Sequence, residues 1–234
     1  LRGLIKITMA KENKNTSVDS KNVEFDELTT TENFFDKNKN ILISGGVGIV
    51  VVLLGFLGYN KFVAEPNNIE SQIEIASAMY DFESDSTEAA VNGTNRNIGL
   101  EEAADAYNGT TGGDIANYSM GIISMQKGEF ETALDYFGNC SFEDVMVANL
   151  CIGLQGDCYV ELTEYAKAVD FFEKAAAREV NEFTTPLYLK KAGLAYEALE
   201  DYSKAIVAYT KIKDNYPQTS EGLDITKYIE RATK

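Results

Sequence analysis

The feature that most restricts how this chain can fold is a run of twenty consecutive residues without a charged side chain, Ile41–Asn60. A helix through Ile41–Tyr59 would be about 28 Å long, which matches the hydrocarbon core of a bilayer. A core helix of that length in a soluble protein should carry a polar face, and this run shows none. The run therefore predicts a transmembrane helix at residues 41–60, with Tyr59 at the membrane interface.

Two features favour a permanent anchor over a cleaved signal peptide. About thirty residues separate Met9 from the run, more than an ordinary n-region, and no A-x-A-like site follows Tyr59. Met9 is the expected initiator, because Ala10-Lys11-Glu12 is a more ordinary start than Leu1. The alternative is that Leu1–Thr8 is a genuine extension.

Lysines near the ends of the run predict its orientation. Three precede it and one follows within twenty residues: Lys21, Lys37, Lys39 and Lys61. Positive residues favour the cytoplasmic side, and acidic residues carry little weight in this rule. We therefore expect a cytoplasmic N-terminus and a C-terminal domain on the other side of the membrane.

Residues 1–40 read as a cytoplasmic tail that is mostly disordered, because polar residues dominate from Lys11 to Asn22. Thr29 and Glu32 have the spacing of a capping box, which predicts a short juxtamembrane helix near the end of the tail.

Within the membrane run, Ser44, Gly48 and Gly55 are spaced by four and seven residues and so share one helix face. Small residues allow a second helix to approach closely, which makes this face a candidate packing surface. The alternative is that glycine is simply common in membrane helices.

Composition excludes several function classes. The 37 acidic and 21 basic residues give a net charge of −16, which argues against binding nucleic acid. The absence of histidine removes Ser-His-Asp and Cys-His catalysis and histidine-containing zinc sites. We expect no enzyme activity, no catalytic residues, no cofactor and no metal.

Local motifs do not indicate a catalytic or ligand-binding site either. The glycine-rich segment 109–113 lacks the lysine and the preceding strand of a P-loop, and the acidic residues 81–88 lack the central glycine of a calcium loop. Cys140, Cys151 and Cys158 form no C-x-x-C motif and are expected to be small buried hydrophobes, with a bridge from Cys140 as the main exception.

A repeat occupies residues 114–217. Glycine, aromatic, alanine and aromatic residues recur at constant offsets in three units that begin 35 and 37 residues apart: Gly121, Gly156, Gly193; Ser124, Tyr159, Tyr196; Phe130, Tyr165, Tyr202; Ala133, Ala168, Ala205; Phe137, Phe172, Tyr209. The pattern resembles the tetratricopeptide repeat, a pair of antiparallel helices of about 34 residues in which small residues let the helices cross closely. The fold class is therefore all-α, with one transmembrane helix followed by a tetratricopeptide-repeat-like α-solenoid.

The segments beside the repeats should also be helical. Residues 61–113 are expected to hold a linker and N-terminal helices at 67–84 and 101–107, separated by a loop at 85–97 and followed by a turn at 108–113. Residues 218–234 should form a helix that caps the open end of the stack. Thr185 is the expected N-cap of the helix that carries Pro186 in its first turn.

The first helix of each tetratricopeptide pair lines the concave side, at positions 2, 5, 9, 12 and 13 of the unit. The residues at these positions are Ile115, Tyr118, Ile122, Met125 and Gln126; Leu150, Asp157, Val160 and Glu161; and Leu187, Lys190, Leu194 and Glu197. An apolar strip with acidic edges suits an extended or helical peptide carrying some positive charge, with Tyr118 and Met125 as anchors. The alternative is that the helix at 67–84 folds back and fills this groove.

The order of elements also resembles one family more narrowly. A short tail with Glu32–Lys39, one membrane helix, an acidic helix pair, the turn Tyr107–Gly113 and degenerate repeats with Phe183–Pro186 are similar to the Bacteroidota branch of the YfgM-type family. These are single-pass inner-membrane proteins that accompany the bacterial Sec translocon. The resemblance implies a periplasmic C-terminal domain, and as partners the Sec membrane subunits, a membrane-anchored periplasmic prolyl-isomerase chaperone and secreted client polypeptides.

Two other functions remain open on the sequence. One is a repeat scaffold for envelope assembly or cell division that is unrelated to Sec. The other is an enzyme with a repeat appendage, for which the chain offers no catalytic constellation.

Overall fold

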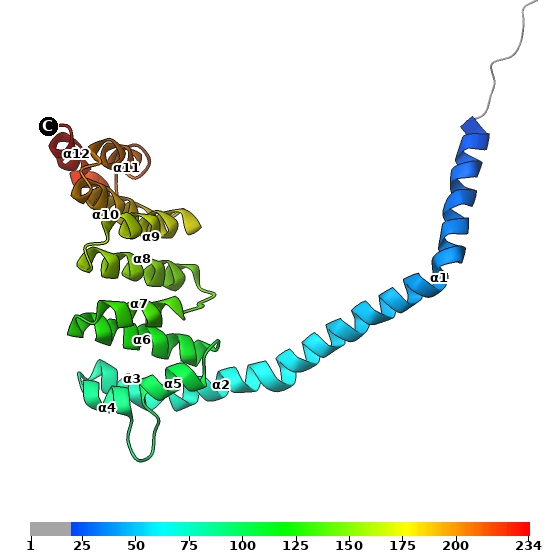
Figure 1. Ribbon diagram of the computed structural model, residues 1–234, viewed down its shortest axis with the longest axis horizontal. Coiled ribbons are helices and arrows are strands. Elements are labelled where there is room, and N and C mark those ends of the chain that lie inside the picture. The colour runs from blue at the N-terminus through cyan, green and yellow to red at the C-terminus, as the bar shows by residue number, and fades with distance from the viewer. Residues whose placement is uncertain (1–19) are drawn as a thin grey trace, which may run out of the picture. The chain divides into compact units, whose positions relative to one another are not determined.

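The computed structural model describes residues 20–234 and their side chains from Lys37 onward (Figure 1). Most of the disordered segment expected at Lys11–Asn22 lies outside the described residues, as do Leu1–Thr8 and Met9. The chain divides into two compact units, Leu1–Asn60 and Lys61–Lys234, which we describe in turn.

The first unit consists, over its described residues, of helix α1, Ser20–Tyr59. Thr29 lies inside this helix, so it does not cap a separate juxtamembrane helix. The large apolar side chains from Ile41 to Leu57 are all exposed. One 18-residue window here has a mean hydropathy of 2.5 and no buried part, which makes the helix long and apolar enough to cross a membrane.

Four short helices open the second unit: α2 (Glu65–Glu74), α3 (Ala76–Glu83), α4 (Thr87–Asn92) and α5 (Leu100–Ala106). A π-helical turn, η1 (Asn60–Ala64), precedes them. The single helix expected at 67–84 is divided at Ile75, a buried residue whose ψ of −14° tightens the end of α2. The loop expected at 85–97 contains α4, which Gly93 ends with a φ of 71°.

The short helices pack into one apolar cluster with the next helix, α6. The cluster comprises the buried residues Ile75, Ala78, Ala90, Leu100, Ala103, Ala104, Ala116, Met120 and Ile123. α4 is too short to show helical periodicity in the sequence, and its buried Ala90 in this cluster explains why the segment is ordered as a helix.

The turn expected at 108–113 is shorter than predicted, because α6 begins at Thr111 and Gly112 lies in its first turn, against α2. The side chain of Asn68 accepts a hydrogen bond from the amide of Thr111 at 2.7 Å, and Ser71 Oγ accepts one from Gly112 at 3.2 Å. A Cβ on Gly112 would lie 2.5 Å from the Ser71 carbonyl carbon. The glycine therefore serves helix packing, which agrees with the rejection of a phosphate loop.

Seven helices follow and stack in chain order (Figure 1). They are α6 (Thr111–Lys127), α7 (Phe130–Gly138), α8 (Val145–Glu161), α9 (Tyr165–Arg178), α10 (Thr184–Ala198), α11 (Tyr202–Asn215) and α12 (Ser220–Ala232). The pairs α6–α7, α8–α9 and α10–α11 are the three helical repeats, and α12 packs on α11 and α10.

The glycines and alanines of the repeat lie where the sequence places the helix crossings. A Cβ on Gly121 would lie 2.5 Å from the ring of Phe137, and one on Gly156 would lie 2.5 Å from the ring of Phe172. Gly193 faces Tyr209 in the same way. The three alanines of the motif, Ala133, Ala168 and Ala205, have no exposed surface. The predicted fold class and repeat register are confirmed.

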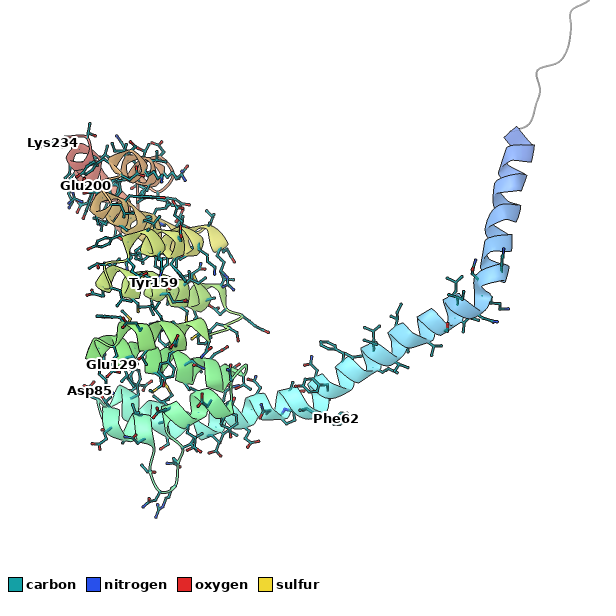
Figure 2. All side chains as sticks on the ribbon, viewed as in Figure 1. Phe62, Asp85, Glu129, Tyr159, Glu200 and Lys234 are labelled. Atoms are coloured by element: carbon teal, nitrogen blue, oxygen red, sulfur yellow. The ribbon has the colours of Figure 1, made fainter. Side chains whose placement is uncertain are left out.

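The turn inside each repeat has the same geometry three times. Gly128, Thr163 and Glu200 adopt φ angles of 77°, 60° and 59°. The amide of the next residue then donates to a carbonyl five residues earlier, at distances of 2.9, 2.8 and 2.9 Å. Glu129 and Glu200 are labelled at these turns in Figure 2. The turn closes each helix with the αL geometry that glycine adopts most easily.

The start of α10 differs from the prediction. Thr185 does not cap the helix, which begins at Thr184. Asn181 Oδ1 accepts hydrogen bonds from the amides of Phe183 and Thr184 at 2.8 and 2.7 Å. Thr185 Oγ1 instead bonds to the carbonyl of Ala176, which joins α9 to α10. The Asn side chain reaches the free amides because residues 181–183 form a tight turn.

Candidate partner-binding surface

The predicted concave residues lie on α6, α8 and α10, the first helices of the three repeats. All thirteen side chains are exposed or half-exposed. Ten of them are apolar, amide or basic, and the other three are carboxylates. α8 and α10 contact each other directly, and we call the predicted residues on these two helices the α8–α10 face. The most exposed large apolar residues on it are Leu150 at 39% and Leu194 at 40%.

The α6 residues are partly used by the fold. Tyr118, Ile122 and Met125 are half-buried against the cluster around Phe137 and Cys158. The Tyr118 ring contacts the edges of Phe137 and Phe142, with centroids 6.1 and 6.4 Å away. Tyr118 therefore supports the junction between the first two repeats, and truncating it would disturb packing as well as the surface.

The upstream helices reach a different part of α6. Ile115 packs against the cluster that α2–α5 form, and Ser119 Oγ lies 3.4 Å from the Met79 sulfur. These contacts cover the α6 face toward the upstream helices, whereas the α8–α10 face keeps Leu150 and Leu194 accessible.

Two of the three carboxylates have cationic partners one repeat further along the chain. Asp157 on α8 forms an ion pair with Lys191 on α10, with Nζ and Oδ2 2.6 Å apart and both side chains about one-third exposed or less. Glu197 on α10 pairs with Arg231 on α12 through two hydrogen bonds of 2.9 and 2.8 Å. Glu161, the third, is exposed.

The environment of Glu197 determines its charge. Burial alone would raise the pKa of this carboxyl, but the hydrogen bonds that Arg231 and Tyr209 donate to it outweigh burial and lower the pKa below its usual value. Burial and the bond to Glu197 raise the pKa of Tyr209. Glu197 therefore holds α10, α11 and α12 together as an ionised acceptor.

The end of the face is bordered by the capping helix. The Lys190 ammonium lies 4.9 Å from the centre of the Tyr228 ring on α12. Lys191 and Arg231, which the sequence analysis did not select, neutralise two of the predicted acidic edges. In the sequence, each of these two basic residues follows its acidic partner by 34 residues, which is about one repeat length. This spacing is the signal that could have found them.

The cysteines are free thiols, with Cys151 and Cys158 buried and Cys140 half-buried. A hydrogen bond with Cys151 and burial raise the pKa of Cys140. Burial raises the pKa of Cys158 to about 12. Protonated thiols are weak nucleophiles, so Cys140 and Cys158 act as packing side chains. Over the part of the chain that the structure describes, no cluster of three metal-ligating side chains occurs.

The small residues predicted to pack in the membrane lie on α1. Ser44 Oγ donates to the carbonyl of Ile41 at 3.0 Å, which satisfies the hydroxyl within its own helix. A Cβ on Gly48 or Gly55 would meet no other atom within 4 Å. The face that they share is open in the single chain.

Comparison with known families identifies the repeats. Residues 152–179 and 189–219 each match a family model described as tetratricopeptide repeat. The two segments cover most of α8–α9 and α10–α11, and they carry the register set by Gly156 and Gly193. No curated protein matched the chain. The second unit is thus a solenoid that contains tetratricopeptide repeats, an architecture that forms protein-interaction surfaces.

Proposed function

We propose that this protein is a membrane-anchored scaffold that binds partner proteins through the α8–α10 face of its repeats. α1 is the anchor, with the N-terminus in the cytoplasm and the solenoid in the periplasm. The observation that carries the proposal is the pair of exposed leucines, Leu150 and Leu194, on adjacent first helices. The other exposed apolar residues of the repeats lie on second helices, as Val207 on α11 does, or at or near helix ends, as Met146 and Leu199 do.

In its finer form, the proposal is that the chain is an ancillary subunit of the Sec translocon. It would pass secreted polypeptides to a membrane-anchored periplasmic prolyl-isomerase chaperone. The order of tail, apolar helix, acidic helices, turn Tyr107–Gly113 and repeats supports this assignment, because it is the order found in YfgM-type proteins. The packing of α2 on the start of α6 makes the turn an integral part of the solenoid.

The face is suited to a peptide or helix that brings apolar side chains and little net charge. Leu150 and Leu194 supply apolar contacts, while the pairing of Asp157 with Lys191 and of Glu197 with Arg231 removes much of the acidic character that the sequence suggested. Glu161 remains as an exposed acidic residue at the end of α8. Interfaces of this kind place an apolar centre inside a polar rim.

Topology is tested with protease added to spheroplasts. We expect the repeat domain to be digested while the tail before Phe34 is protected. Survival of the repeat domain together with cleavage of the tail would show the opposite orientation.

Partner binding is tested by replacing Leu150 and Leu194 with serine in the full-length chain. Both side chains are exposed, so the variant should fold normally but recover less of the Sec subunits and the isomerase chaperone from solubilised membranes. Val207→Ser on α11 is the matched control, because Val207 is 54% exposed and lies on a second helix of a repeat. Equal recovery of the partners with both variants would refute the proposal that the α8–α10 face binds them. Recovery of envelope-assembly or division proteins instead would replace the Sec assignment.

A further inference from the structure

Helices α2 and α3 are apolar on two opposite sides, and the fold uses one of them. Ile75 and Ala78 are buried in the cluster with α6. On the other side, Phe62, Ile69, Ile73 and Tyr80 follow one another at spacings of seven, four and seven residues and are 80%, 53%, 68% and 70% exposed. Ile69 and Ile73 lie one turn apart on α2, and Phe62 on η1 and Tyr80 on α3 extend the exposed apolar residues to either side. We call these four residues the outer stripe.

The outer stripe is hollowed over α2. A shallow open depression is lined by Pro66, Ile69 and Ile73, with Lys61, Glu65, Glu70 and Glu74 around it. Phe62 lies on the helical segment that precedes the stack (Figure 2). A large apolar face of this kind on a folded domain indicates an interaction surface.

The charge around the outer stripe selects its occupant. Between Lys61 and Tyr107 there are ten acidic residues and two basic ones, a net charge of −8 in a chain whose total is −16. Lys61, the basic residue beside the stripe, is paired with Glu65 at 3.1 Å. An anionic lipid surface would be repelled by this charge, and two stripes placed face to face would oppose their own carboxylates.

We propose that the outer stripe binds an amphipathic helix of another protein whose apolar face is flanked by Lys or Arg. Apolar residues spaced by three, four or seven residues on the partner would contact the stripe, and its basic flanks would meet Glu65, Glu70 and Glu74. This second docking surface is separate from the α8–α10 face and does not depend on the role proposed for that face.

The test uses the full-length chain in phosphatidylcholine nanodiscs and two designed helical peptides of about eighteen residues, or five turns. Both peptides carry the same leucine face, one with lysine flanks and the other with glutamate flanks. Fluorescence anisotropy should show that the lysine-flanked peptide binds about tenfold more tightly or better. Equal affinity, or no binding of either peptide, would overturn the proposal.

Variants then locate the binding. Ile69→Ser with Ile73→Ser should weaken the lysine-flanked peptide by about tenfold or more, because two apolar contacts are lost. Leu223→Ser is the matched control, since Leu223 is 73% exposed on α12 and should leave the affinity unchanged. Glu70→Lys with Glu74→Lys should make the glutamate-flanked peptide the better ligand. An unchanged preference in that variant would refute the charge argument.

A photoreactive amino acid at Ile73 separates the occupants. With the lysine-flanked peptide present we expect peptide adducts. Lipid adducts in its place would assign the stripe to the membrane, and covalent dimers would assign it to a second copy. Leu150→Ser with Leu194→Ser should not change the peptide adducts, so failure of the α8–α10 proposal and failure of this one are distinguishable.

Discussion

Replacing Thr163 by glycine should stabilise the protein, although glycine substitutions usually destabilise. Thr163 is exposed at the turn between α8 and α9 and has a φ of 60°. A residue with a Cβ pays about 1–2 kcal/mol in this region, and a β-branched side chain is especially unfavourable there. Glycine loses about 0.5–1 kcal/mol more backbone entropy on folding. The difference predicts a gain of about 0.5–1 kcal/mol for Thr163→Gly.

The first repeat provides the reverse experiment. Gly128 occupies the same turn position with a φ of 77°, and a Cβ there would meet no other atom within 4 Å. Gly128→Thr should therefore destabilise by about the amount that Thr163→Gly stabilises, through backbone conformation alone. Thr226→Gly, in the exposed part of α12, should instead cost a few tenths of a kcal/mol because it lowers helix propensity.

The measurement is urea unfolding of the full-length chain in detergent, with thermal unfolding as a second readout. One kcal/mol corresponds to about 2–4 °C in Tm for a domain of this size. A loss of stability in Thr163→Gly, or no change in Gly128→Thr, would show that the turn does not store the backbone strain that we assign to it.

Three further predictions concern packing, charge and the membrane helix. Ala168→Phe should lower the free energy of unfolding by about 1–3 kcal/mol, because Ala168 has no exposed surface. Ala166→Phe, at an exposed position, should lower it by about 0.5 kcal/mol or less. Equal effects of the two changes would refute the close crossing of α8 and α9 at Ala168. Because the folded-state pKa of Glu197 is lowered, this residue stabilises the fold above its ordinary pKa of 4.5 and loses that effect as the pH falls below it. The cost of Glu197→Gln, about 1–2 kcal/mol at pH 7, should therefore shrink at pH 3, and a constant cost would contradict the assignment. Gly48→Leu with Gly55→Leu should lower recovery of membrane partners without disturbing the solenoid, and unchanged recovery would reject a helix-packing role for these glycines.

The repeat could be predicted from the sequence because its signal is side-chain size at fixed positions. Gly156 is small because the ring of Phe172 lies against it, and Ala168 is small because it has no free surface. Such requirements act on single residues and recur at each repeat. The uncharged run at 41–60 is equally direct, since its length and composition alone satisfy the criterion for a membrane span.

Features that depend on contacts between distant segments were harder to predict. α4 is ordered by Ala90 in a cluster with α5 and α6, and its own sequence is too short to show a period. The N-cap of α10 was assigned to Thr185 because a threonine before a proline is a common signal. The helix begins earlier, at Thr184, and Asn181 in the preceding loop accepts hydrogen bonds from the amides of Phe183 and Thr184. Neither outcome can be read from local propensity.

The candidate surface shows the same limit. The positions of Leu150 and Leu194 followed from the repeat register. The loss of acidic character did not, because Asp157 and Glu197 are neutralised by cations that lie one repeat away in sequence and come close only in the stacked helices. The preference for Tyr118 as an anchor likewise could not include its contact with Phe142, which depends on the loop after α7.

Photocrosslinking from Leu194 in native membranes tests the central claim most directly. A photoreactive residue at this position on α10 should form adducts with a Sec membrane subunit or the isomerase chaperone, whereas the same residue at Val207 on α11 should not. Adducts of equal yield from both positions, or none from Leu194, would contradict the proposal that the α8–α10 face binds the partners of this protein.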